Sequence, residues 1–514
     1  MGTKINSNYS DLLTFTRASK GHALRPVSYG TELVSSSDQN QSATSTDAIV
    51  GVEVDPISVE VGKIYFVSAT VTATSTGTFK NADWGIGEPN IDPVQSSTFD
   101  LLNEQDAYED NVETNVYGTV IPNQSTIGVA FRVGGTSSGN NTLTVSNISV
   151  KEVTFDQPDG TLTLFEHPEN IPRVEYDADG NRLGLLVEEQ RVNLVAYSED
   201  FTDASWNKST GTTVTSSTTV APNGVAGCSR VQFTAGSRAG RYVQNALSPS
   251  PLASATHTIS VWVKSTSGTN QTFSLKCTHG GVADYFSSDF TATSEWQRFD
   301  FSQAFGAGGT SAIAGVVADS SGNAADLEVW GFQFEGDASF PTSYMKNEGT
   351  ASGAIRSADV ASIPVADFGY NQSAGTFFID ITDVISNNNK DYFSVSSSGS
   401  FNPESFGLYG TPDTGSTLGY RRRNSAYDPA ITSTADIQST GSKVALSHDA
   451  SSLVISVDGV ATETSSSNSV DTITEIAFGG SGHGVTGDVH SKHIKSIKYY
   501  PRRLTNAQLV ELTS

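Results

Sequence analysis

Cysteine and methionine are scarce in this 514-residue chain, which contains two of each. The two cysteines, Cys228 and Cys277, cannot form a disulfide framework for a chain long enough to hold about three domains. Basic residues are also few, because 30 Lys and Arg stand against 55 Asp and Glu and leave a formal net charge of −25. So acidic a chain is repelled by nucleic-acid phosphates and by anionic lipids, so neither is an expected partner.

Long apolar stretches are missing as well. No apolar run of about 18 residues occurs, and residues 1–6 lack the apolar centre of a signal peptide. Neither membrane insertion nor export by the general secretory route is therefore expected. The hydrophobic fraction is 36%, but these residues fall in short alternating runs between turns rich in Gly, Ser and Asn. This pattern predicts many half-buried strands and argues against disorder.

The alternating runs suggest two sister domains, at residues 31–153 and 201–346. The first contains an expected strand at 63–72, and the second has the run 257–264 in the corresponding place. Four apolar positions near the end of each domain also align. They are Leu143, Val145, Ile148 and Val150 in the first domain, and Leu327, Val329, Phe332 and Phe334 in the second. A repeat of this length indicates a domain duplication rather than a solenoid.

The remaining residues divide into connectors and a third domain. Residues 1–30 read as a short irregular segment, 154–200 as a connector with a hairpin at Asp179-Gly180, and 347–358 as a linker. The third strand-rich region, 359–514, ends in an expected helix near 505–512 with Thr505 as its N-cap. Many short strands with one helix predict an all-β fold of tandem β-sandwiches.

Several segments resemble those of tailed-bacteriophage virion proteins. They are LTFTRAS at 13–19, GLLVEEQRVNL at 184–194 with YSEDF at 197–201, and WGFQFEG at 330–336 with FPTSY at 340–344. The last pair resembles the end of a carbohydrate-binding-module-like jelly roll. Region 359–514, which closes in YYPRRLTNAQL at 499–509, resembles a concanavalin A-like, laminin-G-like sandwich.

The resemblance implies two jelly-roll-like sandwiches followed by one laminin-G-like sandwich. Region 31–153 departs from the family pattern, in which the opening segment runs almost directly into the connector, so this domain looks inserted. The implied function is a virion surface appendage of the tail fibre or tail spike type that binds host-surface glycans. Such proteins are often homotrimers, and residues 1–30 would attach this one to other virion proteins.

Two alternatives stand beside this interpretation. One is a capsid-bound head fibre or decoration protein whose sandwiches are mainly structural. The other is a tail spike that depolymerises polysaccharide, although the long parallel β-helix repeat usual in such spikes is not found. The sequence also lacks a Gly-x-Ser-x-Gly elbow, a His-Glu-x-x-His motif and a phosphate loop. We therefore expect no enzymatic activity.

Sugar binding requires a flat aromatic face with polar groups around it. In the run 257–264, Ile259, Val261 and Val263 should point inward, which leaves Trp262 beside Lys264 on the opposite face. Trp262 and Lys264 are therefore candidate glycan-binding residues, unless a neighbouring sheet or protomer covers them. Trp84, in a Gly-rich segment expected to be a loop, is a further candidate.

The only basic cluster of the chain lies at 420–424, and it contributes the candidates Tyr420, Arg421 and Arg423. Arginines can hold the carboxylates of acidic polysaccharides in bidentate fashion. The alternative is that this cluster neutralises acidic neighbours or a partner subunit.

No cofactor is predicted. Sandwiches of these types often hold Ca²⁺, but Asp177 and Asp179 fit a turn better than a calcium loop. The histidines at 483, 490 and 493 do not have the spacing of a zinc site. The side chains of Cys277 and His279 are expected to diverge along a strand, so they are not expected to form a nucleophile and base.

Overall fold

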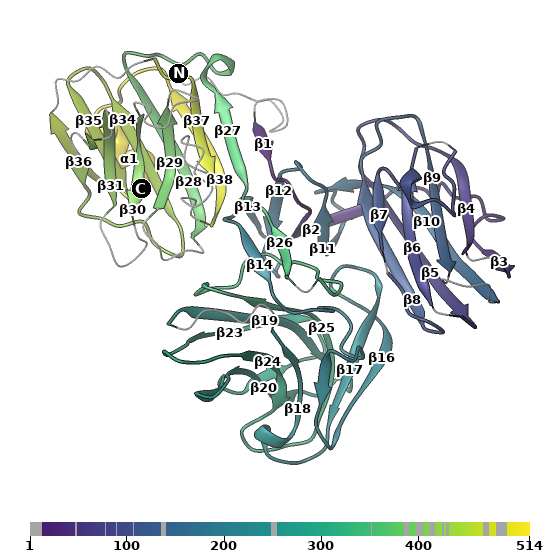
Figure 1. Cartoon of the computed structure of the whole chain (residues 1–514). Coiled ribbons are helices and arrows are strands. Elements are labelled where there is room, and N and C mark those ends of the chain that lie inside the picture. The colour runs from purple at the N-terminus through teal and green to yellow at the C-terminus, as the bar shows by residue number, and fades with distance from the viewer. Residues whose placement is uncertain are drawn as a thin grey trace.

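The computed structural model describes residues 13–46, 49–77, 79–88, 90–105, 107–134, 140–247, 254–350, 352–384, 390–396, 405–410, 417–423, 426–427, 431–465, 472–479 and 491–514. Almost all of its regular structure is strand, arranged as three β-sandwiches around a small central sheet (Figure 1). The prediction of an all-β fold of tandem sandwiches is confirmed. No helix in these ranges is long and apolar enough to cross a membrane.

The first sandwich packs two sheets together. One has the order β3 (Gln41–Ser45), β10 (Asn141–Phe155), β5 (Tyr65–Ser75) and β8 (Glu113–Val120), and the end of β10 also pairs with β2 (Gly21–Tyr29), which pairs with β11 (Thr161–His167). We call β2 and β11 the central sheet. The other sheet of the sandwich has the order β4 (Ile49–Ser58), β9 (Thr126–Gly134), β6 (Lys80–Gly87) and β7 (Leu102–Glu104). Alternate residues of each strand face the core, so Val67, Ala69 and Val71 of β5 are buried, as the period of two predicted.

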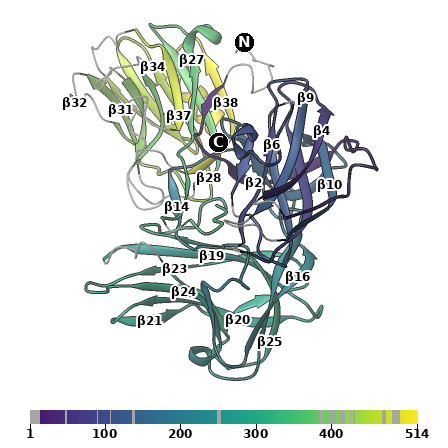
Figure 2. The same cartoon turned by 45° about the vertical axis from the view of Figure 1, so that its right-hand side comes forward.

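The second sandwich has a corresponding pair of sheets. The first contains β16 (Thr212–Val220), β17 (Ala226–Phe233), β25 (Ala325–Glu335), β19 (Thr256–Ser265) and β23 (Gln297–Ala304). The second contains β15 (Trp206–Lys208), β18 (Tyr242–Ala246), β24 (Ala312–Ala318), β20 (Gln271–His279), β21 (Ala283–Phe286) and β22 (Phe290–Ala292). In Figure 2 these two sheets lie below the other domains.

The two sandwiches share a bulge at the same place, which supports the predicted duplication. In the first, the register between β5 and β10 shifts around Asn147, whose φ is 55°. In the second, the register between β19 and β25 shifts around Gly331, whose φ is 67°. Because both residues occupy the left-handed region, the strand bends in the same way in each domain. The eight aligned apolar side chains are all buried.

The third sandwich is built from the C-terminal region and from strands that come from elsewhere in the chain. One sheet has the order β12 (Arg173–Tyr176), β13 (Arg182–Val187), β38 (Lys492–Tyr500), β28 (Gly375–Val384), β34 (Ser442–His448), β35 (Ser452–Val457) and β36 (Val460–Ser465). The other contains β1 (Thr14–Thr16), β27 (Val360–Pro364), β37 (Glu475–Gly479), β29 (Lys390–Ser396), β30 (Ser405–Gly410), β31 (Leu418–Arg423), β32 (Ala426–Tyr427) and β33 (Ile431–Thr432).

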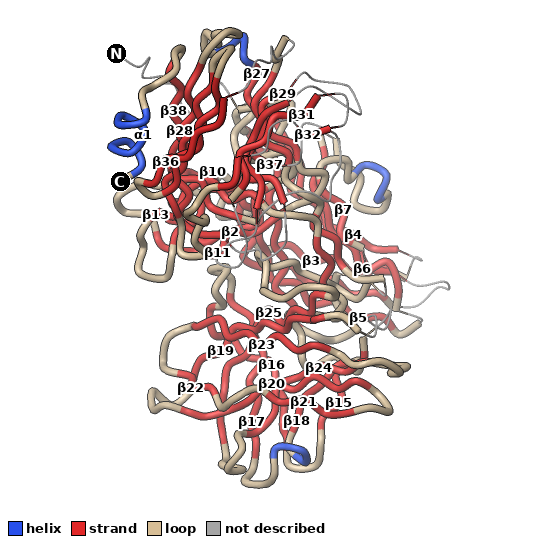
Figure 3. The backbone as a smooth tube through the Cα atoms, turned by 90° about the vertical axis from the view of Figure 1, so that its left-hand side faces the viewer, coloured by secondary structure: helices blue, strands red, loops and turns tan. Residues whose placement is uncertain are grey.

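Two local features, a hairpin and a helix, were predicted correctly from the sequence. The hairpin at Asp179-Gly180 joins β12 to β13, and Gly180 adopts a φ of 81°. The helix α1 (Asn506–Thr513) begins after Thr505, whose side chain accepts a hydrogen bond from the backbone of Gln508 in a capping box. Figure 3 shows α1 against the third sandwich.

Residues 14–16 and 21–29 form strands, although residues 1–30 were predicted to be irregular, while attachment through this segment stays a prediction. β1 pairs with β27 of the third sandwich, and β2 (Gly21–Tyr29) pairs along its length with β11 (Thr161–His167). Their backbone hydrogen bonds are used within the chain, and Phe15 is buried in the third core. Residues 1–12 lie outside the described part. The chain leaves β2, builds the first sandwich and returns in β11 beside β2, as an inserted domain would.

The linker at 347–358 is likewise more regular than predicted. Its last residues form β26 (Ala354–Arg356), which pairs with β14 (Arg191–Asn193) from the connector. β14 in turn contacts β25 of the second sandwich. The connector therefore contributes strands to both the second and the third sandwich.

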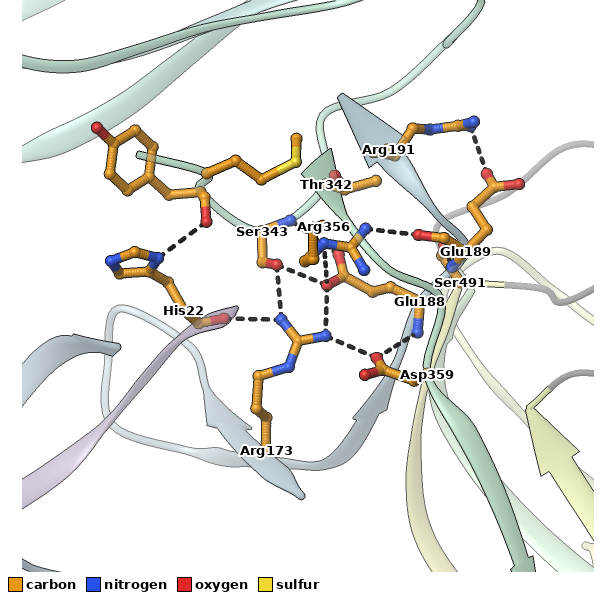
Figure 4. Close-up of polar contacts among 12 residues, drawn as sticks. His22, Arg173, Glu188, Glu189, Arg191, Thr342, Ser343, Arg356, Asp359 and Ser491 are labelled. Carbon is orange, nitrogen blue, oxygen red and sulfur yellow. Dashed lines mark hydrogen bonds and ion pairs between the residues drawn. The ribbon is translucent and has the colours of Figure 1, made fainter. Parts of the chain in front are cut away.

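Five buried charged side chains meet where the domains converge, and we call Arg17, Arg173, Glu188, Arg356 and Asp359 the central ion cluster. All five side chains are at most 1% exposed. Arg173 bridges Asp359 at 2.6 Å and Glu188 at 2.8 Å, as Figure 4 shows. Arg17 lies 3.3 Å from Asp359, and Arg356 lies 3.5 Å from Glu188.

Neighbouring polar groups complete the cluster. The Ser343 hydroxyl donates a hydrogen bond to Glu188 at 2.6 Å, and the Glu188 backbone N–H donates one to Asp359 at 2.8 Å (Figure 4). Burial alone would raise the pKa of Glu188, but Arg356 and Arg173 lower it to about 2. The carboxylate therefore stays ionised among the arginines.

Removing one carboxylate from this cluster should destabilise the protein strongly. We expect Asp359→Asn to lower the free energy of unfolding by about 3–5 kcal/mol, because it leaves buried arginines uncompensated. The matched control is Asp326→Asn, which breaks a partly exposed pair with Arg230 and should cost much less. Urea denaturation measures the free energy of unfolding of both variants. Equal losses of stability would contradict the role given to the central ion cluster.

A second buried pair joins the connector to the third sandwich. Nε2 of His493 on β38 lies 2.7 Å from Glu175 of β12, and Nδ1 lies 3.7 Å from Asp383. Burial by itself lowers the pKa of His493, but hydrogen bonding and attraction to Asp383 and Glu175 outweigh burial and raise it to about 9.

This pair makes stability depend on pH in the alkaline direction. Because the folded-state pKa lies above the unfolded value of about 6.5, the stabilisation is complete below pH 6.5 and is lost as pH rises through about 9. In the wild type, the melting temperature should fall as pH rises over this range, and we expect this fall to be smaller in His493→Gln. Glu175→Gln should reduce the fall in part, whereas an unchanged profile in both variants would contradict the role of the pair.

Candidate functional site

Trp84 is not available for a ligand. It lies within β6 rather than in the predicted loop, is 1% exposed, and stacks on Phe131 at 6.0 Å in the first core. The glycines around it misled the prediction: Gly85 and Gly87 lie in β6, where neighbouring residues leave no room for a side chain. A sugar cannot reach the ring in this structure.

Trp262 and Lys264 lie on the face of β19 opposite Ile259, Val261 and Val263, as predicted. That face is largely covered by the central sheet. Trp262 joins an apolar cluster in which Trp330 and Tyr344 meet residues of β2 and β11. The ammonium of Lys264 lies 5.7 Å from the ring centroid of Trp296. Trp262 therefore takes part in a contact between domains, which was the alternative weighed for it, whereas Lys264 contacts a residue of its own sandwich, and both side chains remain partly exposed.

The basic cluster lies in β31, where the backbones of Tyr420 and Arg421 pair with β30. The side chains of Tyr420, Arg421 and Arg423 lie outside the described part of the structure, so their proposed role stays a prediction.

Metal-binding groups do not gather in the described ranges. No group of three or more His, Cys, Asp or Glu side chains there could hold a metal ion. Asp177 instead accepts backbone hydrogen bonds from Asp179 at 3.0 Å and Asn181 at 2.8 Å, so it shapes a turn. His483 and His490 lie outside the described residues.

Cys277 and His279 do not diverge, contrary to expectation. They are two residues apart on β20, so both side chains point into the second core, where each is almost fully buried. His279 stacks on Phe305 at 4.4 Å. Burial raises the pKa of the Cys277 thiol, so it stays protonated and is a poor nucleophile.

The two sister domains differ in their outer face, which we define as the side of the β9 or β24 sheet that points away from the core. In the first sandwich this face is filled by the segment 90–101. A Cβ atom on Gly51 would lie 2.6 Å from Pro93, and one on Gly85 would lie 2.4 Å from Phe99. The glycines let the segment lie directly on the sheet, so this face is occupied by the chain itself.

The outer face of the second sandwich carries polar and aromatic side chains. Lys276 of β20 pairs with Gly315 of β24, and Gly315 in turn pairs with Gln244 of β18. Tyr242, Gln244 and Phe286 remain partly exposed on this face. With Arg238 from the adjoining 3₁₀ turn (Arg238–Gly240), these residues form what we call the aromatic–cation patch, made of Arg238, Tyr242, Gln244, Lys276 and Phe286.

Cations lie against the rings of this patch. The ammonium of Lys276 is 5.7 Å from the ring centroid of Tyr242 and 6.0 Å from that of Phe286. Lys276 also forms an ion pair with Asp284 at 3.1 Å. The guanidinium carbon of Arg238 lies 4.3 Å from the ring centroid of Phe286. Distances of this size give cation–π attraction, which holds the cations in place.

The sequence analysis missed this patch. Alternation around Val243 could have placed Tyr242 and Gln244 on an outward face, but nothing in the sequence shows which outward faces stay uncovered. The five residues are also spread from 238 to 286, and only the pairing of β18, β24, β20 and β21 brings them together.

The comparisons with known proteins found likenesses of structure alone. No protein-family model and no curated protein matches the chain. A carbohydrate-binding module, CBM40, of the Ruminococcus gnavus IT-sialidase, solved with α2,3-sialyllactose, is 18% identical over 28% of this chain and 84% of its own, with a TM-score of 0.25.

Two further structures match other shares of the chain. The CBM22 tandem domain of Paenibacillus barcinonensis Xyn10C is 11% identical over 64% of this chain and 96% of its own, with a TM-score of 0.22. Domain 4 of the Geobacillus stearothermophilus arabinanase AbnA, solved with arabinotriose, is 16% identical over 30% of this chain and 73% of its own, with a TM-score of 0.22. The likeness concerns the fold of parts of the chain.

Proposed function

We propose that this chain is a non-catalytic, glycan-binding protein of a phage virion appendage, with the aromatic–cation patch as a binding site. The observation that carries the proposal is the contrast between the sister sandwiches. The first fills its outer face with its own segment 90–101, while the second leaves polar and aromatic side chains partly exposed at the matching place. The second sandwich is therefore the binding domain, and the first is mainly structural.

The patch has the chemistry that saccharides require. The partly exposed rings of Tyr242 and Phe286 offer apolar surface and Gln244 offers an amide, while the largely buried Lys276 adds a positive charge against the rings. Gly315 lies between Gln244 and Lys276 in the sheet and has no side chain, so the middle of the patch is shallow. Oε1 of Gln244 is buried and has no hydrogen-bond partner among the described residues.

The absence of catalysis is part of the proposal. Glycoside hydrolysis uses two carboxyl groups about 5–9.5 Å apart around the scissile bond. The patch itself contains no carboxyl group, and the one in contact with it, Asp284, is paired with Lys276. Binding without cleavage fits such a surface better than hydrolysis does, and weak single sites gain avidity when several copies are displayed together.

The virion setting rests on the segments that resemble phage proteins. Their residues Arg17, Glu188 and Ser343 meet in the central ion cluster or contact it directly, so these segments support the arrangement of the domains rather than the ligand site. The setting therefore needs a separate test from the binding site. A homotrimer attached to other virion proteins belongs to the same proposal.

Binding is tested with the full chain on a glycan array that holds neutral and acidic saccharides. We expect binding to at least one class, and Tyr242→Ala with Phe286→Ala should weaken it at least tenfold. The control is Tyr29→Ala, an aromatic side chain 40% exposed on β2 and distant from the patch in sequence and sheet. Unchanged binding in the double variant would show that the binding site lies outside the patch. If the wild-type chain bound no glycan at all, a glycan-binding function would be contradicted.

Immunoelectron microscopy of the purified virion tests the setting. An antibody against residues 359–514 should label the tail tip or baseplate. Label scattered over the capsid would instead identify a head fibre or decoration protein, and the absence of label from virions would contradict the virion proposal.

A further inference from the structure

We infer that the ligand of the aromatic–cation patch is an acidic saccharide, and that Arg238 binds its carboxylate. This inference rests on the proposed function and specifies the class of ligand at the same site.

Arg238 is the decisive residue because its hydrogen-bonding groups are unused. Within the described part of the structure it forms neither an ion pair nor a hydrogen bond, although it is half-buried and lies 4.3 Å from the centroid of Phe286. Its neighbour Arg241 differs, since that guanidinium donates to the backbone oxygens of Thr210 and Gly240, both at 2.9 Å. Arg241 therefore shapes the turn, and Arg238 is left available.

A guanidinium that stacks on an aromatic ring is well placed to bind a carboxylate. The ring holds the guanidinium in place through cation–π attraction and leaves N–H groups on its edges free. A planar guanidinium can then donate two parallel hydrogen bonds to one carboxylate. Less rotational freedom is lost on binding because Phe286 already restrains the side chain.

The local charge also favours an acidic ligand. Arg238 and Lys276 carry two positive charges, and Asp284, paired with Lys276, carries one negative charge, so this group has a net charge of +1 in a chain whose net charge is −25. Each ring of the patch has a cation against it, so a saccharide that contacts either ring also meets a positive charge. An anionic saccharide is therefore the complementary ligand.

The test compares acidic polymers with neutral forms of the same polymers. Polygalacturonate, alginate and hyaluronan, and each of them after reduction of its carboxyl groups, are titrated into the full-length protein by calorimetry. We expect at least one acidic polymer to bind and its carboxyl-reduced form to bind at least tenfold more weakly. Arg238→Gln should weaken binding of the acidic polymer at least tenfold, and Arg238→Lys should bind it with intermediate affinity.

The control variant is Arg230→Gln, which removes a partly exposed arginine from the other sheet and should leave affinity unchanged. Thermal melting should be the same for Arg238→Gln and the wild type, since the side chain makes no hydrogen bond in the described structure. Equal binding of acidic and reduced polymers, or binding only of neutral saccharides on the array, would overturn the inference and leave the proposed function standing. A failure to bind any saccharide would overturn both.

Discussion

The burial of five charged side chains in one place constrains the whole molecule. A buried charge without a partner costs several kcal/mol, so each member of the central ion cluster must find its counterion. Arg17 precedes the first sandwich, Arg173 and Glu188 belong to the connector, and Arg356 and Asp359 lie between the second and third sandwiches. The charges are satisfied together only when these segments converge, so the cluster determines how the domains are oriented around the centre.

The two sister sandwiches show how a duplicated frame acquires separate roles. The bulges at Asn147 and Gly331 and the buried positions around them are the same in both domains. What differs is the outer face, which has glycines such as Gly85 under the segment 90–101 in the first domain and Lys276 beside aromatic rings in the second. A residue without a side chain lets the polypeptide pack on the sheet, whereas a lysine beside aromatic rings leaves a charged surface.

The sequence predicted the local features well, because they depend on neighbours in the chain. The period of two placed Val67 and Val261 in the cores, and the capping residue Thr505 marked the start of the helix. Prediction from the sequence failed where the exposure of a residue depends on segments far away in the chain. Nothing near Trp84 shows that its loop-like glycines belong to a packed strand, and nothing near Trp262 shows that a second sheet covers it.

The same limit applies to the residues that matter most. Arg17, Glu188 and Ser343 lie in the segments that carried the family resemblance, but only the structure shows that they converge. Arg238 gave no signal, because its value as a ligand-binding group depends on Phe286, 48 positions later, and on the lack of any other partner.

The central ion cluster also sets an order for folding during synthesis. The first sandwich has all of its strands once residue 155 has emerged from the ribosome, and the second once residue 335 has emerged, so each can form its own core in turn. Arg173 can already pair with Glu188, but Arg17 has to wait for Asp359. Closure of the cluster is therefore a late event that joins domains already folded, and a nascent chain that stops short of residue 359 lacks the carboxylate that holds Arg17 and Arg173 together.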